Sequence, residues 1–545
     1  MMTQSKIQNG LRRSAVRLFS LLTPPSSLLV LFSLLVLFSF LLVSCTLDED
    51  PHDQMLEEEA HITPATLFQN TVITLYNYIG GHEDGQGLQG TCRGVYDLQT
   101  FGSDEAIIPT RGGDWYDGGI WQHMYRHSWS AGHSFPSKAW TYLYKVITLC
   151  NRSLEHLEDH RDLLDSETYT AYMAEARALR AIYYWYLLDL FGNVPIITSS
   201  RLSMNDVTQS TRAEVFDFVE KELRSVCPYL SSERSNLKGN YYGRVTQAVA
   251  LFTLAKLMLN AEVYAGTPRW QDCINDCDQI EQLGYVLEPS YTKNFAVHNE
   301  TSSENIWTIP MDRELFQNQQ QNLHRSYHYR HADAYGFLGE NGSCATPHVM
   351  KIFGLGTPEE DTRLELNYWT DTVYDTNGRV VTDRVGNPLV YYPWEVMLDL
   401  SGSPYVEMAG ARMKKYEVDL NAMKDGKLMD NDIVLFRFAD VLLMRAEAKL
   451  RSGQDGQADY DAVRSRVGMP TRPISLQNLL DERLFELCWE GWRRQDLIRF
   501  GQYESLFEGD FFNDKVDESD GHTCLYPIPS DVLTQIHTMK QNPGY

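Results

Sequence analysis

The residues with the clearest chemical potential are aromatic side chains beside acidic ones in glycine-rich segments. One group lies on a single stretch of the chain: Asp114, Trp115, Tyr116 and Trp121. Glycine pairs at 112–113 and 118–119 flank the first three, and no helical or strand periodicity assigns the rings to a core. The sequence therefore predicts surface loops over residues 103–129. An exposed aromatic pair there has a stability cost unless it packs or binds a ligand.

A second group of rings comes from a later segment rich in glycine, asparagine and tyrosine: Tyr329, Trp369 and Trp394. Sugars present flat C–H faces that stack on such rings, and each stack contributes ~0.5–1.5 kcal/mol if aromatic pairs are a guide. Asp, Asn and Arg side chains at the rim would bind the sugar hydroxyls. The two groups together predict a sugar-binding platform. For each ring, core packing is an equal alternative, because large aromatic residues dominate cores as well.

Catalytic motifs are missing from the sequence. It contains no G-x-S-x-G, no H-E-x-x-H and no phosphate-binding loop ending in Gly-Lys-Ser/Thr. Gly85, Gly87 and Gly90 match a dinucleotide fingerprint, but no apolar strand precedes them and no periodic helix follows, so we expect a loop. The sequence predicts a binding protein that is not an enzyme. The many carboxylates leave a glycoside hydrolase as the alternative.

Composition narrows the class of protein further. The apolar share of 43% is typical of a globular chain, and the net charge of -25 excludes a nucleic-acid-binding protein, which needs a basic face. The cysteine spacing forms no disulfide framework or zinc knuckle, and we interpret Cys273 and Cys277 as core thiols. The sequence predicts no metal and no cofactor, while leaving a structural calcium ion open.

The N-terminus has the features of a targeting segment. Four basic residues come first, and the apolar run 28–43 is shorter than the ~20 residues that a membrane-spanning helix needs. The run ends in Leu42-Val43-Ser44-Cys45, which resembles a bacterial lipobox. We therefore predict a signal peptide over 1–44, a lipid on Cys45 and an acidic linker over 45–60. A retained membrane anchor is the alternative.

Helical periodicity dominates the rest of the chain. In the stretch 171–195, Tyr172, Ala176, Leu179 and Tyr183 step by four, three and four, and small or apolar residues occupy other sides too. Such a helix must be covered on several sides, so we place it at the centre of the fold. Further helices are expected at five places: 139–157, 211–226, 245–264, 270–283 and 436–450. Their lengths favour antiparallel pairs stacked as in tetratricopeptide repeats.

Five segments resemble the SusD/RagB family of outer-membrane, glycan-binding lipoproteins. The central helix matches that family's motif at Glu175, Arg177, Leu179, Arg180, Ala181, Tyr184, Leu187, Phe191, Gly192, Val194 and Pro195. An earlier helix matches at Trp140, Tyr144, Ile147 and Asn151. The stretch 482–501 matches the C-terminal signature, and Tyr526–Pro529 and Gln541–Tyr545 match the closing segments.

The resemblance implies a mostly α, SusD-like domain over residues 61–545. Helical repeats would occupy about 134–284 and 430–501, and a loop-rich, ligand-binding excursion with short hairpins about 285–430. Asn377-Gly378 marks one hairpin. Along 482–501, charges of both signs follow one helical face, which predicts structural ion pairs: Arg483, Glu486, Glu490, Arg493 and Asp496.

The resemblance also implies a function and a location. The protein would capture a glycan or oligosaccharide and deliver it to a SusC-like TonB-dependent transporter. The acidic residues 46–50 resemble the surface-export signal of Bacteroidota lipoproteins, so we expect a lipid-anchored protein of the outer membrane that faces the exterior. Family resemblance transfers no binding residues. A repeat scaffold that binds proteins or peptides is a further alternative.

Overall fold

The computed structural model describes residues 62–315, 318–422, 425–503 and 520–545. The predicted signal peptide, Cys45 and the predicted acidic linker lie outside them. Residues from Thr63 onward form one compact unit. Within the described residues no helix has the length and apolar character needed to cross a membrane.

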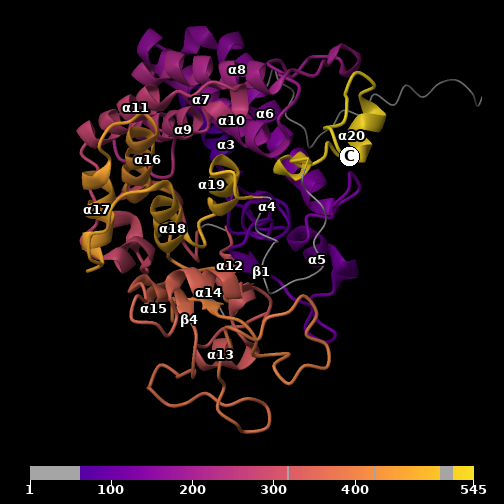
Figure 1. The fold of residues 1–545 in the computed structure, drawn as a ribbon. Coiled ribbons are helices and arrows are strands. Elements are labelled where there is room, and N and C mark those ends of the chain that lie inside the picture. Colours follow the sequence, from indigo (N-terminus) through magenta and orange to yellow (C-terminus); the bar gives the residue numbers. More distant parts are fainter. Residues whose placement is uncertain (1–61, 316–317, 423–424, 504–519) are drawn as a thin grey trace, which may run out of the picture. The chain divides into compact units, whose positions relative to one another are not determined.

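Helix α7 (Ser166–Phe191) is the central element, as the sequence predicts. It starts at Ser166 because the Asp165 side chain accepts a hydrogen bond from Thr168 N (2.9 Å), and it ends at Gly192, whose φ is 69°. Its second half is buried on every side. Helix α6 (Ser134–Asp159) packs on α7, and so does α8 (Arg212–Val226) (Figure 1).

The longer helices stack in pairs around this centre. Helix α11 packs against both α9 and α16, so the chain resumes its helical stack after the excursion (Figure 1). Thr211 and Glu214 form a capping box at the start of α8. The helix expected over 245–264 is broken at Asn260. The helices that continue the stack beyond α8 are α9 (Gln247–Leu259), α10 (Ala261–Ala265), α11 (Trp270–Gln282), α16 (Phe438–Arg451), α17 (Gln457–Arg466) and α18 (Leu476–Leu487).

Short elements complete the described part of the chain. The short helices are α2 (Pro64–Phe68), α3 (Thr74–Tyr76), α4 (Val95–Thr100), α5 (Ile120–Tyr125), α12 (Gln321–Ser326), α13 (Tyr329–Ala334), α14 (Pro347–Phe353), α15 (Arg363–Asn367), α19 (Arg493–Arg499) and α20 (Ser530–Gln535). The strands form antiparallel pairs: β1 (Ala106–Ile107) with β3 (Cys344–Ala345), β2 (Asn305–Ile309) with β6 (Ile433–Arg437), and β4 (Tyr368–Trp369) with β5 (Arg412–Met413). The mostly helical fold with short sheets is confirmed.

The excursion is closed at its base by the β2–β6 pair, which we call the neck. Inside it, the hairpin predicted at Asn377-Gly378 is present, with Asp375 N donating to Arg379 O (2.8 Å) and Gly378 at a φ of 75°. The excursion holds more regular structure than expected, since α12 to α15 lie within it. Cys273 and Cys277 are free thiols and fully buried, as the sequence predicts.

Two sequence predictions are corrected by long-range contacts. The stretch 103–129 is not all surface loop: it contains β1 and α5, and Trp121 is only 2% exposed. The Trp121 ring packs edge-on against Phe101 and Phe135, and its Nε1 donates to Asp117 Oδ2 (2.9 Å). This hydrogen bond gives the indole a partner inside the protein, so Trp121 belongs to the core.

The second correction concerns the C-terminal signature, which is not one helix. Helix α18 ends at Leu487, Trp489 has a φ of 64°, and α19 begins at Arg493. The chain leaves the helix because Lys415 Nζ binds the carbonyl oxygens of Glu486 (3.0 Å) and Cys488 (2.7 Å).

The ion pairs of the signature are structural, but the partners differ from those expected. Arg483 pairs with Asp440 (2.9 Å) and Asp496 (2.8 Å) rather than with Glu486 or Glu490.

A buried cluster of charges joins the neck to α18, and we call it the neck network. Its members are Glu304, Arg363, Lys415, Arg437, Glu486 and Glu490, each with a side chain at most 1% exposed. Arg437 lies at its centre. Its Nη1 is 2.7 Å from Glu304 and 2.5 Å from Glu486, and its Nε is 2.8 Å from Glu490. The pKa of Glu486 lies well below its ordinary value because the surrounding arginines outweigh the effect of burial.

The segment 520–545 closes over the centre of the fold. Tyr526 OH donates to Leu98 O (2.7 Å), and Asn542 Nδ2 donates to Phe191 O (2.9 Å) at the end of α7. Trp129 Nε1 donates to Tyr545 OH (2.6 Å). These contacts fix the two closing motifs recognised in the sequence against residues more than 350 positions earlier.

Glu105 gives the folded state a distinctive pH dependence. Burial raises its pKa to about 8, although the Trp489 N–H and Lys415 both favour the carboxylate. A carboxyl group whose pKa is higher in the folded state destabilises the fold as pH rises from ~4.5 to ~8, by ~1.4 kcal/mol per pH unit. We expect Glu105→Gln to remove this contribution. Denaturant titrations at pH 5 to 8 will measure it.

The difference between the stability curves of the parent and of Glu105→Gln reports on Glu105 alone, because both proteins keep the other buried carboxyl groups. Asp432, whose pKa burial raises to about 7, contributes equally to each profile. Parallel stability curves for the parent and Glu105→Gln across this range would contradict the assignment.

Candidate functional site

The glycine-flanked loop is held from below by the segment that follows the hairpin. Thr110 N donates to Leu398 O (2.9 Å), and Leu400 N donates to Thr110 O (2.8 Å). Arg111 is buried beneath the loop, where it donates to the carbonyl oxygens of Val406 and Ala409 (2.9 Å each). Burial and the nearby Arg412 lower the pKa of Arg111 to about 9. The loop is therefore a supported structure on which Asp114 and Tyr116 are exposed.

Two predicted site residues from distant parts of the chain meet on this surface. Tyr329 OH donates to Asp114 Oδ2 (2.6 Å), although 215 positions separate them. Asp114 is exposed, and Tyr329 is half-buried at the start of α13. Burial and the Asp114 carboxylate raise the pKa of Tyr329 above its ordinary value. The Arg384 guanidinium lies 5.6 Å from the centre of the Tyr329 ring. Tyr329, Asp114 and Arg384 thus offer a ligand an aromatic ring, a carboxylate and a guanidinium at one place.

The two aromatic residues after Asp114 have different surroundings. Trp115 is half-buried: its Nε1 donates to Glu340 O (2.9 Å), and its ring lies against Gly342, where a Cβ would come within 2.7 Å. Tyr116 is 57% exposed. The Tyr116 ring is thus accessible to a ligand. Trp115 packs against Gly342 and also borders the site.

The remaining candidates lie on neighbouring segments. Trp369 is half-buried beneath the hairpin, with Nε1 donating to Tyr327 OH (2.9 Å) and Lys414 Nζ 4.4 Å from the ring centre. Among the described contacts it has none with the Asp114–Tyr329 pair. Trp394 is 46% exposed, on the segment that supports the loop.

The structure also places two residues near Tyr329 that the sequence interpretation missed: His328, which is buried, and Glu407, which is partly exposed. His328 Nε2 lies 3.1 Å from Glu407 Oε2, and burial lowers the pKa of His328 to about 4. His328 was detectable as the neighbour of Tyr329, but no local signal marks Glu407. Within the described ranges, no group of three or more His, Cys, Asp or Glu residues could hold a metal ion. The arrangement can therefore stack and hydrogen-bond a ligand through its own side chains.

A helical-repeat fold that presents supported aromatic and polar side chains on loops defines a binding protein. The family comparisons agree with this class. The SusD family model matches residues 303–545, and a second model, described as starch-binding associating with outer membrane, matches residues 100–259. The chain belongs to the SusD/RagB family. The prediction of a binding protein rather than an enzyme is confirmed by this membership.

Individual relatives cover most of the chain. The starch-binding protein SusD of Bacteroides thetaiotaomicron is 26% identical over 502 residues, which cover 85% of this chain and 87% of that protein. Two solved structures share the fold. One is a laminarin-binding SusD-like protein, at 23% identity and a TM-score of 0.68, covering 89% of this chain and all of the other. The second is surface glycan-binding protein A of Bacteroides thetaiotaomicron in complex with laminarihexaose. Its identity is 19% and its TM-score is 0.70, and the match covers 88% of this chain and all of that protein.

Proposed function

We propose that the protein is a cell-surface, glycan-binding lipoprotein of the outer membrane. It captures a polysaccharide or oligosaccharide and passes it to a SusC-like TonB-dependent transporter. The observation that carries the proposal is the pairing of Asp114 with Tyr329 beside the exposed ring of Tyr116. Relatives whose names state starch or laminarin binding support the same class of ligand.

The chemistry of this surface suits a sugar. The rings of Tyr116 and Tyr329 provide flat apolar faces, and Asp114 and Glu407 provide acceptors for hydroxyl groups. Arg384 adds a donor over the Tyr329 ring. Trp394, exposed on the supporting segment, extends the proposed platform.

A panel of soluble glycans tests the proposal. Titration calorimetry with starch, laminarin and other polysaccharides should find at least one that the purified protein binds and does not cleave. Binding to peptides alone would favour the alternative of a protein- or peptide-binding scaffold. Release of sugar from any bound glycan would contradict the proposal and favour a glycoside hydrolase.

The transporter partnership has its own test. Extraction of native outer membranes in mild detergent, followed by affinity capture of the protein, should recover a TonB-dependent barrel. Recovery of the protein alone under conditions that keep other lipoprotein complexes intact would contradict the partnership.

The lipid anchor depends on Cys45, which lies outside the described residues. We expect Cys45→Ala to abolish incorporation of a labelled fatty acid and to release the protein from the membrane, since acyl chains supply ~0.8 kcal/mol of membrane affinity per buried methylene. Cys524→Ala, far from the lipobox, is the control and should stay labelled. A Cys45→Ala protein that still incorporates the label would contradict the lipobox.

A further inference from the structure

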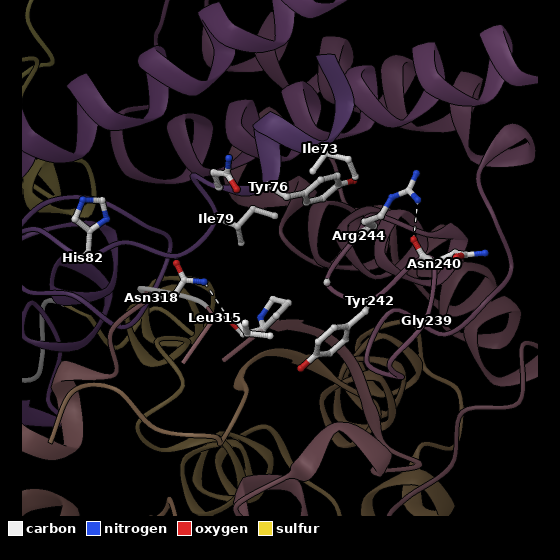
Figure 2. A pocket seen from close by; sticks show the side chains of 13 residues that line it. Ile73, Tyr76, Ile79, His82, Gly239, Asn240, Tyr242, Arg244, Leu315 and Asn318 are labelled. Atoms are coloured by element: carbon white, nitrogen blue, oxygen red, sulfur yellow. Dashed lines mark hydrogen bonds between the residues drawn. The ribbon is translucent and has the colours of Figure 1, made fainter. Parts of the chain in front are cut away.

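A cavity lined by none of the aromatic-site residues lies between the N-terminal helices and the loop 239–244 (Figure 2). Its volume is about 510 Å³, within the ~300–1,000 Å³ typical of small-ligand sites. Tyr76 and Tyr242 line it from segments far apart in the sequence, and Figure 2 shows them at the upper and lower sides of the view.

Both tyrosine rings are fixed from behind. The Tyr76 hydroxyl donates to the Glu175 carboxylate and accepts from Val245 N (2.9 Å). Tyr242 OH donates to Asp432 Oδ1 (2.6 Å). Because the hydroxyl groups are already bonded to the protein, these residues offer the cavity their rings. The cavity thus has two preorganised apolar walls.

Three polar side chains of the cavity are available to a ligand. Asn77, His82 and Asn240 are exposed, and their side chains form no hydrogen bond with any other residue in the described part of the chain. The cation of the cavity, Arg244, is already neutralised. Its Nε and Nη2 bind Glu175 (2.8 and 2.6 Å), and its Nη1 binds Asn240 O (2.7 Å).

We propose that this cavity is a second glycan-binding site, which holds one end or a short stretch of a neutral sugar chain. Two rings for C–H stacking and three side chains free to bind hydroxyls fit a polyol better than an ion, because the charge of Arg244 is compensated by Glu175. The inference rests on the proposed function. A long polysaccharide that occupies both sites gains avidity, whereas a short oligosaccharide does not.

Variants at exposed, unpartnered residues test the cavity with little effect on the fold. Asn77→Trp fills it, and Asn240→Ala removes one amide. Leu237→Ala is the matched control, because Leu237 is exposed on the same loop but does not line the cavity. Calorimetry uses a polysaccharide that the parent binds and a hexasaccharide of the same glycan, and thermal melts accompany each variant.

We expect both cavity variants to weaken polysaccharide binding about tenfold or more, since avidity can exceed a single affinity by ~10²–10⁴. The hexasaccharide should bind twice per parent molecule and once per variant molecule. Polysaccharide affinity and hexasaccharide stoichiometry equal to those of Leu237→Ala would overturn the second site. The two proposals fail differently: if Tyr116→Ala has no effect while the cavity variants lose binding, the aromatic loop is wrong and the cavity holds. No binding of any glycan by the parent overturns both.

Discussion

Arg437→Ala should be severely destabilising. The substitution leaves Glu304, Glu486 and Glu490 buried without the guanidinium that contacts all three. Breaking a buried ion pair costs ~3–5 kcal/mol. Arg437 contacts three carboxylates, which in the variant would share only Arg466, Arg363 and Lys415. We therefore expect a large drop in Tm or no folded protein, measured by thermal melts and by the yield of soluble chain.

Two further variants make this result specific. Arg201→Ala removes an exposed cation, 72% accessible, which lies 3.2 Å from Asp159, and should cost about 1 kcal/mol or less. Arg437→Lys keeps the charge but loses the forked geometry, so its stability should lie between the parent and Arg437→Ala. A melting temperature for Arg437→Ala equal to that of Arg201→Ala would show that the neck network does not stabilise the fold.

The largest effect on ligand binding is expected at Tyr116. Removal of its ring by Tyr116→Ala should weaken glycan binding about tenfold, which corresponds to ~1.4 kcal/mol, while Tm stays unchanged. Calorimetric titration with the glycan selected from the panel gives the affinity, and a thermal melt gives the stability. Tyr229→Ala is the matched control, since Tyr229 is 58% exposed and Tyr116 57%.

Trp115 is less suited to this test than its neighbour. Its ring packs against Gly342 and Trp121, and its Nε1 binds Glu340 O, so Trp115→Ala should lower stability as well as affinity. Equal glycan affinities for Tyr116→Ala and Tyr229→Ala would place the platform elsewhere on the protein.

Local signals in the sequence predict the helical part of the fold well. The periodicity of α7, the capping box of α8 and the glycine after α11 each act within a few residues, so one sequence contains the whole signal. Predictions from the sequence fail where a residue far away in the chain determines the local structure. Lys415 Nζ donates hydrogen bonds to carbonyl oxygens at the end of α18. The helix ends there, although the sequence pattern of 482–501 is helical throughout.

The candidate site also combines features that the sequence predicts with features that depend on long-range contacts. Glycines around Trp115 and Tyr116 mark the loop from the sequence alone. The hydrogen bond from Tyr329 to Asp114 and the burial of Trp121 depend on residues brought together by the fold, and sequence spacing contains no information about them. For each aromatic ring, the choice between core and surface therefore required the structure.

The closing contacts of residues 526–542 have a consequence for how the chain folds. Leu98 O and Phe191 O receive their hydrogen bonds from Tyr526 and Asn542, so two early segments reach their final environment only when much later residues arrive. Contacts of such sequence separation raise the contact order and slow folding, because the entropy of closing the long loop is lost before the contacts form. A chain that emerges from the ribosome N-terminus first would leave α7 incompletely covered until residues 526–542 have been synthesised. Its apolar surface is then a binding site for chaperones, and this makes the order of emergence part of the protein's folding mechanism.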